Sequence, residues 1–116
     1  MARGDIVLVP FPFTDLTGQK RRPALVVSPD GFDPEDLVLC AITSRVPGRL
    51  LPWDVSLDTQ DLAEGQLPRP SLVRVGKLFT MHHALIVGRF GSIRPQKLAD
   101  VLTLLQRLFE PGTRSP

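Results

Sequence analysis

Residues 4–28 read GDIVLVPFPFTDLTGQKRRPALVVS, and two apolar runs in this stretch flank a polar loop. The first run, 5–9, is typical of a β-strand and ends at prolines, which cannot donate hydrogen bonds to a neighbouring strand. The second run, 23–28, is almost continuously apolar and predicts a central strand. The loop between them ends in three consecutive cations, Lys20, Arg21 and Arg22. Because strands hold loops in position, we expect this loop to present positive charge to a phosphate.

The rest of the chain predicts more short strands and then one helix. We expect strands over 37–43, 53–57, 71–75, 78–80 and 86–90, and a loop or single helical turn over 58–70. Apolar residues recur at helical spacing from Pro95 to Phe109, which predicts a helix with Pro95 in its first turn. Ser92 is the residue suited to cap this helix, and Pro111-Gly112 ends it. Short strands followed by a terminal helix predict a mainly β, α+β fold, a twisted antiparallel sheet or small barrel with the helix packed against it.

Length, charge and cysteine content narrow the class of protein. The 116 residues predict one domain, 1–116. A net charge of +2 and a pI of about 9.2 permit an anionic partner without requiring one. The single cysteine, Cys40, excludes an intramolecular disulfide and fits a reducing compartment. No apolar stretch approaches the roughly 20 residues that span a bilayer, and the N-terminus lacks a signal-peptide pattern, so we expect a cytoplasmic protein without membrane association.

Three places offer side chains that could bind or act on a phosphate. Arg22 precedes Pro23, which restricts its backbone to extended conformations and so gives the guanidinium a defined direction. Thr43 and Ser44 close an apolar strand, where hydroxyls can orient a phosphate or a 2′-OH but more often bond locally. Arg74 lies between valines and therefore on the opposite face of its strand, either in solvent or in a cleft. From the residues alone, solvated surface cations remain an alternative interpretation of both arginines.

Other polar or aromatic features indicate no further chemistry. His82 and His83 are interpreted as exposed turn residues, because neighbours on a strand point to opposite faces and no set of metal ligands lies nearby. Trp53 could stack on a base, but a single Trp in a small domain is more often part of the core or its rim. One acidic turn lacks the spacing of a calcium-binding loop and is interpreted as solvated; it comprises Asp30, Asp33, Glu35 and Asp36. We therefore expect no metal and no cofactor.

Four stretches together resemble the MazF/PemK family of toxin ribonucleases from toxin–antitoxin pairs. They are Gly4-Asp5 with Pro10-Phe11, Arg22-Pro23 with the strand after it, Ala41-Ile42-Thr43-Ser44, and Ser71-Leu72-Val73-Arg74 followed by Thr80. Their order and spacing carry the resemblance, and they cover most of the chain. The resemblance implies an SH3-like barrel of twisted antiparallel strands with a C-terminal helix, as in CcdB and MazF, usually assembled as a homodimer.

The resemblance also implies a reaction. Family members cut single-stranded RNA at short sequences without a metal, leaving 2′,3′-cyclic phosphate and 5′-OH ends. Carried over, Arg22 stabilises the phosphorane or protonates the leaving oxygen, and Thr43 holds the phosphate, so these two are the expected catalytic residues. The expected RNA-binding residues are Lys20, Arg21, Ser44, Arg74 and Lys77. A cognate antitoxin is expected to insert an acidic segment into the cationic cleft, and nucleic-acid binding in the wider sense, DNA included, is also expected.

The chain departs from the family pattern at the positions of the usual proton acceptors. Many members have Glu or His in the first loop, where this chain has only Asp15, and some have an acid where Gly76 stands. The stretch from Gly76 to Thr80 is altered as well. Two alternatives therefore remain: a catalytically weakened RNA-binding relative, and a CcdB-like toxin with a protein target. The CcdB-like alternative lacks support from residues 110–116, because they do not end in the Trp-Gly-Ile that is associated with that activity.

Overall fold

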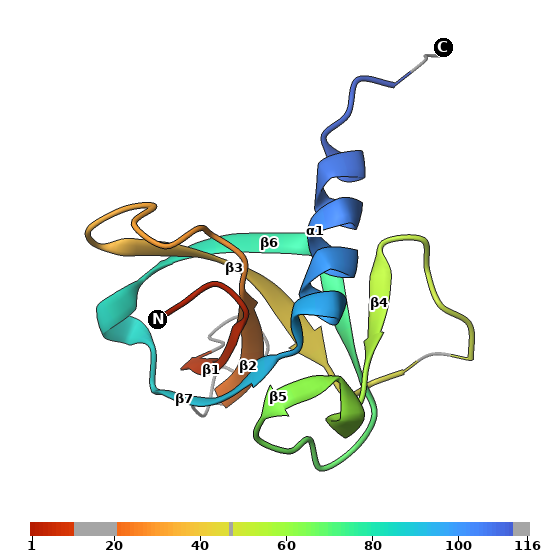
Figure 1. Ribbon diagram of the computed structural model, residues 1–116, viewed down its shortest axis with the longest axis horizontal. Helices are drawn as coiled ribbons and strands as arrows, with labels where there is room; N and C mark the ends of the chain where they lie inside the picture. The colour runs from red at the N-terminus through yellow and green to blue at the C-terminus, as the bar shows by residue number, and fades with distance from the viewer. Residues whose placement is uncertain (11–20, 47, 113–116) are drawn as a thin grey trace.

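The computed structural model describes residues 1–10, 21–46 and 48–112, and the account below is confined to them. In these ranges the chain forms seven strands, two 3-10 turns and one helix (Figure 1). The strands are β1 (Asp5–Pro10), β2 (Arg21–Val26), β3 (Asp36–Thr43), β4 (Asp54–Leu57), β5 (Leu62–Glu64), β6 (Ser71–His82) and β7 (Gly88–Ile93). The turns are η1 (Thr59–Asp61) and η2 (His83–Leu85), and the helix is α1 (Pro95–Leu108).

The strands form one antiparallel sheet in the order β4-β6-β3-β2-β1-β7-β5. The longest strand, β6, pairs with both β3 and β4, and its register against β3 shifts in the middle. Cys40 pairs with Leu78, yet its neighbour Ala41 pairs with Arg74, so residues 75–77 form a bulge. Bulges of this kind bend and twist a strand. The result is a curved half-barrel of antiparallel strands with α1 beside it, as expected from the sequence (Figure 1).

The alternation of side chains along the strands builds a core on each face of the sheet. One core contains Ile6, Leu25, Cys40, Ile42 and Val73, and the apolar side of α1 packs on it through the fully buried Val101. The other contains Val7, Val9, Ala24, Val26 and Leu39, with Phe79 and Met81 of β6 packed against them. Both faces of β1 and β2 are buried, which explains why these two strands have continuously apolar sequences rather than alternating ones.

The structure corrects several expectations about these elements. The pieces 71–75 and 78–80 are one strand, because the bulge carries β6 past Gly76 without ending it. The segment 58–70 contains β5 as well as a helical turn; a short edge strand with a single buried residue, Leu62, leaves little signal in the sequence. Ser92 does not cap α1, since Arg94 occupies that position without a side-chain cap and the Ser92 hydroxyl instead faces Glu64 Oε1 at 3.3 Å.

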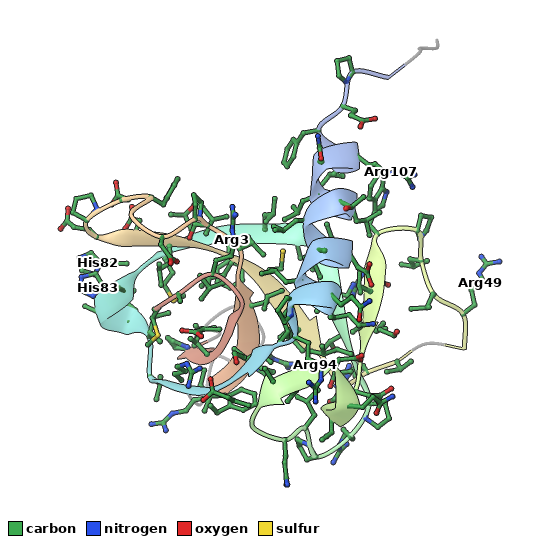
Figure 2. All side chains as sticks on the ribbon, in the orientation of Figure 1. Arg3, Arg49, His82, His83, Arg94 and Arg107 are labelled. Carbon is green, nitrogen blue, oxygen red and sulfur yellow. The ribbon has the colours of Figure 1, made fainter. Side chains whose placement is uncertain are left out.

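The two histidines differ from the expectation in two respects. His83 is exposed at the start of η2, as expected, but His82 ends β6 and is half-buried (Figure 2). Its Nδ1 accepts a hydrogen bond from the Ala84 N–H at 3.0 Å, and the two imidazole rings stack with centroids 4.7 Å apart. The rings do not point to opposite faces, because the strand gives way to a turn between them.

Candidate functional site

The ends of β2 and β3 bring Arg22 and Thr43 to the same face of the sheet. Ala24 of β2 pairs with Ala41 of β3. Arg22 and Thr43 each lie two residues from this pair, toward the same end of the sheet, and side chains two apart on a strand share a face. Both are half-buried. The Thr43 hydroxyl oxygen accepts a hydrogen bond from the Arg45 N–H at 3.1 Å, which fixes the direction of the chain as it leaves β3.

Arg74 belongs to this face as well, and it is held there by a buried carboxylate. Arg74 pairs with Ala41 on one side and with Asp54 of β4 on the other. Its Nε lies 2.8 Å from Asp54 Oδ1, and the Asp54 side chain is only 4% exposed while that of Arg74 is 29% exposed. The second oxygen, Oδ2, is buried without a hydrogen-bond partner among the described residues. Such a carboxylate restrains the guanidinium beside it, since both are removed from much of the competing water.

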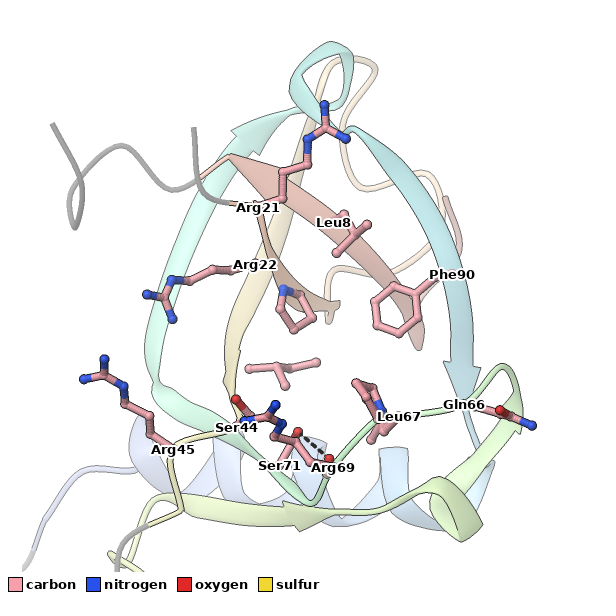
Figure 3. Close-up of a pocket in the computed structure, with 13 residues that line it drawn as sticks. Leu8, Arg21, Arg22, Ser44, Arg45, Gln66, Leu67, Arg69, Ser71 and Phe90 are labelled. Atoms are coloured by element: carbon pink, nitrogen blue, oxygen red, sulfur yellow. Dashed lines mark hydrogen bonds between the residues drawn. The ribbon is translucent and has the colours of Figure 1, made fainter. Parts of the chain in front are cut away.

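A cavity of about 690 Å³ opens at the same end of the sheet, on the opposite face (Figure 3). Its apolar interior is formed by Leu8, Pro23, Ile42, Leu67 and Phe90. Its polar lining consists of Arg21, Arg22, Ser44, Arg45, Gln66, Arg69 and Ser71, with Pro68 between them. Figure 3 shows Arg22 and Arg45 extending to one side of the cavity and Arg21 to another. None of the lining residues that the structure describes is acidic, so the charged side chains among them are all cationic.

Short contacts hold the segment 66–69 against the mouth of this cavity. The Thr59 hydroxyl accepts from the Leu67 N–H at 3.0 Å and donates to the Leu67 carbonyl at 3.1 Å. The Ser71 hydroxyl donates to the Arg69 carbonyl at 3.1 Å (Figure 3). Gly65, with φ of +89°, lies so close to the Phe90 carbonyl that a side chain there would collide with backbone. The close approach of Gly65 to the Phe90 carbonyl brings two segments that are remote in the sequence to one wall.

The residues expected from the sequence therefore divide between two faces. Arg22, Thr43 and Arg74 share one face, and Arg21 and Ser44 line the cavity on the other, with Arg22 at the edge between them. Lys77 is exposed in the bulge of β6 and does not line the cavity. Lys20 and Asp15 lie outside the described residues. The arrangement presents guanidinium and hydroxyl groups on both sides of the two strand ends, which suits a ligand with several phosphates.

Ionisable groups elsewhere are engaged in the scaffold. Arg89 bridges Asp5 Oδ1 at 3.0 Å and Glu64 Oε1 at 2.8 Å, which ties β1, β7 and β5 together. The hydrogen bond and charge of Arg89 lower the pKa of Glu64, and the same contacts, from Glu64 first and Asp5 next, raise the pKa of Arg89. Burial raises the pKa of the Cys40 thiol to about 12, so it is neutral at physiological pH.

The acidic turn is ordered by its own backbone. Asp33 Oδ2 accepts from the N–H groups of Glu35 and Asp36, each at 2.8 Å, and these bonds lower the pKa of Asp33. Among the described residues no group of three or more His, Cys, Asp or Glu side chains is placed to hold a metal ion. The one α-helix of the described ranges is too short and too polar to cross a membrane.

Comparison with known proteins agrees with this architecture. Residues 2–109 match the model of the PemK-like, MazF-like toxins of type II toxin–antitoxin systems. The chain belongs to the PemK/MazF toxin family. Among curated protein sequences there is no significant match.

Solved structures of MazF toxins share the fold. The MazE–MazF complex of Deinococcus radiodurans (Form-III) is 25% identical, with a TM-score of 0.72 over 93% of this chain and 94% of that one. Mycobacterium tuberculosis toxin MazF-mt6 is 20% identical, with a TM-score of 0.70 over 90% and 95%. An endoribonuclease from a mycobacterial species, in complex with its cognate antitoxin, is 19% identical, with a TM-score of 0.73 over 97% and 98%. MazF-family homologues thus include endoribonuclease toxins.

The sequence patterns did not predict every residue at the site of this PemK/MazF chain. Arg69 and Phe90 reach the cavity from segments remote from the cationic loop, and nothing in their local pattern distinguishes them. Arg45 directly follows Ser44, the last residue of the stretch Ala41-Ile42-Thr43-Ser44. Asp54 had a weak signal: an acid between Trp53 and Val55, at the start of an otherwise apolar strand, is typical of a residue with a buried partner.

Proposed function

We propose that this PemK/MazF chain is a metal-independent, sequence-specific endoribonuclease that cuts single-stranded RNA. The 2′-OH oxygen attacks the adjacent phosphorus and gives up its proton, the bond from phosphorus to the 5′ oxygen breaks, and that oxygen takes a proton. The products carry 2′,3′-cyclic phosphate and 5′-OH ends. The observation that supports this proposal best is the register that puts Arg22 and Thr43 opposite one another on one face, at the edge of a cationic cavity.

Arg22 and Thr43 are the proposed catalytic pair. Arg22 supplies a guanidinium, which can hold two phosphate oxygens at once and stabilise the charge that accumulates on them in the phosphorane. It is also the proposed proton donor to the leaving 5′ oxygen. Thr43 orients the phosphate through its hydroxyl. Arg74, restrained by Asp54 on the same face, is proposed to hold a neighbouring phosphate. Lys20, Arg21, Ser44 and Lys77 complete the proposed RNA-binding set.

A cleavage assay in EDTA tests the catalytic proposal. A long unstructured RNA is incubated with the wild type and with Arg22→Ala, Arg22→Lys and Arg107→Ala, and the product ends are analysed. Arg107 lies on the last turn of α1 and serves as the matched arginine control (Figure 2). We expect cyclic phosphate ends, loss of cleavage in Arg22→Ala, and only partial recovery in Arg22→Lys, which keeps the charge but not the planar fork.

Two results would contradict this proposal. Cleavage by a folded Arg22→Ala variant at the wild-type rate would remove Arg22 from the mechanism. A folded wild type that binds RNA and leaves it intact would indicate the weakened RNA-binding relative, because a proton acceptor contributes about 10²–10⁴ in rate and the usual ones are missing.

The proposal includes two protein partners. One is a cognate antitoxin, since the similar mycobacterial endoribonuclease was solved in complex with its own cognate antitoxin. The antitoxin of this chain is proposed to bind an acidic segment over the cationic face. Charge pairing of that kind weakens as salt is added, so salt-independent affinity in a titration series would contradict it. The other is a second copy of the chain. Exposed apolar side chains such as Leu50, Leu51 and Phe109 offer area for association, and a monomer mass by sedimentation at micromolar concentration would contradict it.

A further inference from the structure

We propose that Asp54 is a positioning residue for RNA cleavage, which acts by fixing the direction of the Arg74 guanidinium. In this role Arg74 binds a phosphate through the geometry of its hydrogen bonds more than through net charge. The ligand of Arg74 rests on the proposed ribonuclease function, but the hold of Asp54 on Arg74 rests on the contact between the two side chains. That hold can be tested without RNA.

Backbone contacts beside Asp54 fix the place of its carboxylate. Asp54 lies opposite Arg74 across the β4–β6 ladder. Its own N–H donates to the Leu51 carbonyl at 3.1 Å, and the Trp53 carbonyl accepts from the Val75 N–H at 2.9 Å. These bonds hold the start of β4 against β6, so the carboxylate is a fixed anchor for the side chain opposite it.

The contact engages the Nε edge of the guanidinium. Arg74 Nε lies 2.8 Å from Asp54 Oδ1, and the Arg74 side chain is 29% exposed. A guanidinium is planar and carries N–H groups on more than one edge, so an edge that faces away from Asp54 can hold two phosphate oxygens. Arg74 also pairs with Ala41, two residues before Thr43, on the face that carries Arg22. It therefore offers this edge beside the phosphate proposed at Arg22 and Thr43.

The burial of Asp54 indicates a role beyond stability. Its side chain is 4% exposed, and Oδ2 has no hydrogen-bond partner among the described residues. A buried carboxylate with one oxygen unpaired is costly, and an apolar pair of similar volume is often at least as stable. An unpaired buried group of this kind is explained when the orientation of its partner serves function.

The same carboxylate reduces the net charge that Arg74 offers to RNA. Water screens a buried charge only weakly, so the negative charge of Asp54 offsets the positive charge of Arg74 as a ligand approaches. Removing the carboxylate therefore has opposite effects on two quantities. Electrostatic attraction of RNA becomes stronger, whereas the alignment of the bound RNA becomes poorer.

Variants of Asp54 separate orientation from charge. Asp54→Ala removes the acceptor and the charge, and Asp54→Asn keeps one acceptor oxygen. The matched control is Asp5→Ala, because the Asp5 carboxylate is 10% exposed and lies 3.0 Å from Arg89 Nε in a similar pair. Cleavage of a long unstructured RNA in EDTA is measured where circular dichroism shows every variant folded. We expect Asp54→Ala to lower kcat about tenfold, Asp54→Asn to recover part of this loss, and Asp5→Ala to match the wild type.

Binding of an RNA that cannot be cut reports the charge. The probe is a 2′-O-methyl oligonucleotide, which lacks the nucleophilic hydroxyl. We expect Asp54→Ala and Asp54→Asn to bind it at least as tightly as the wild type at low salt. The slope of log Kd against log salt concentration should steepen by up to about 0.7, the value for one more charge on a single strand. Weaker binding together with weaker cleavage would instead indicate a structural defect and overturn the proposal.

Two further measurements show whether Asp54 acts through Arg74. Arg74→Ala and the double variant Asp54→Ala/Arg74→Ala should have the same kcat, because removing Asp54 has no further effect once its partner is gone. In nitrogen-15 NMR spectra, the Arg74 Nε–H should exchange slowly with water in the wild type. In Asp54→Ala it should exchange as fast as the Nε–H of the exposed Arg107.

The outcomes separate this inference from the proposed function. Wild-type kcat in folded Asp54→Ala, or an equal loss in Asp5→Ala, would overturn the positioning role even where the wild type cuts RNA. Unchanged exchange of the Arg74 Nε–H in Asp54→Ala would overturn it as well. A wild type that binds the probe and leaves long RNA intact would contradict the ribonuclease. In that case slow Nε–H exchange that depends on Asp54 would still support its hold on Arg74.

Discussion

The ion pair between Arg74 and Asp54 yields the sharpest quantitative expectation, because its two members differ in exposure. At 2.8 Å and an effective dielectric constant of about 20, the gross attraction is about 6 kcal/mol, and desolvation offsets most of it. Removing one member leaves the other charge without compensation, which typically costs about 3–5 kcal/mol for a buried partner. Asp54 is 4% exposed and Arg74 is 29% exposed, so the abandoned carboxylate suffers more than the abandoned guanidinium.

We therefore expect an order of effects. Arg74→Met, which strands the buried Asp54, should lower the free energy of unfolding by about 3–5 kcal/mol. Asp54→Asn, which leaves an arginine that can regain water, should lower it by about 2–3 kcal/mol and the Tm by about 8–12 °C. The double variant should be more stable than the sum of the single changes implies, by about 1–2 kcal/mol.

Urea unfolding followed by circular dichroism measures all four proteins of this cycle. Glu64→Gln serves as a control for a solvent-exposed ion pair, and we expect its midpoint to fall less than that of Arg74→Met or Asp54→Asn. Additivity of the two single changes to within about 0.5 kcal/mol would refute the coupling. A larger loss for Asp54→Asn than for Arg74→Met would refute the argument from exposure.

Three further outcomes are expected. Gly65→Ala should lower the free energy of unfolding by about 2 kcal/mol or more in a urea melt, since its φ is +89° and the new Cβ would meet the Phe90 carbonyl; an unchanged midpoint would show that the backbone can yield. Native Cys40 should resist iodoacetamide at pH 8 by mass spectrometry and react only after unfolding, because burial raises its pKa to about 12. Arg89 lowers the pKa of Glu64 below its ordinary 4.5, so the contribution of their ion pair to folding stability is complete above pH 4.5 and is lost as the pH falls through the lower folded-state pKa. In a plot of Tm against pH, Glu64→Gln should therefore reduce the fall of Tm at acid pH, and an unchanged fall would contradict this expectation.

Local physical rules account for the parts of the fold and site that could be read from the residues. Period-two and continuous apolar runs identified most strands, and helical spacing after Pro95 identified α1. The restriction that Pro23 imposes on the backbone of Arg22 is local as well, and it indicated Arg22 as a candidate site residue. The same rules did not predict β5, which is too short to show a pattern. They also gave the wrong cap for α1, because the Ser92 hydroxyl donates to Glu64 on the neighbouring strand instead.

The sequence by itself determined the mainly β class, the terminal helix, and the membership that Arg22-Pro23 and Thr43-Ser44 suggested and the family model confirmed. Only the tertiary structure decided that Asp54 restrains Arg74, and that Phe90 and Arg69 join Arg21 around one cavity. The physical reason is the separation along the sequence over which each effect acts. Alternation, proline and helix period act between residues a few positions apart and are written in the local pattern. The pairing of β4 with β6, and the bulge that bends β6, depend on how the whole sheet buries its two faces.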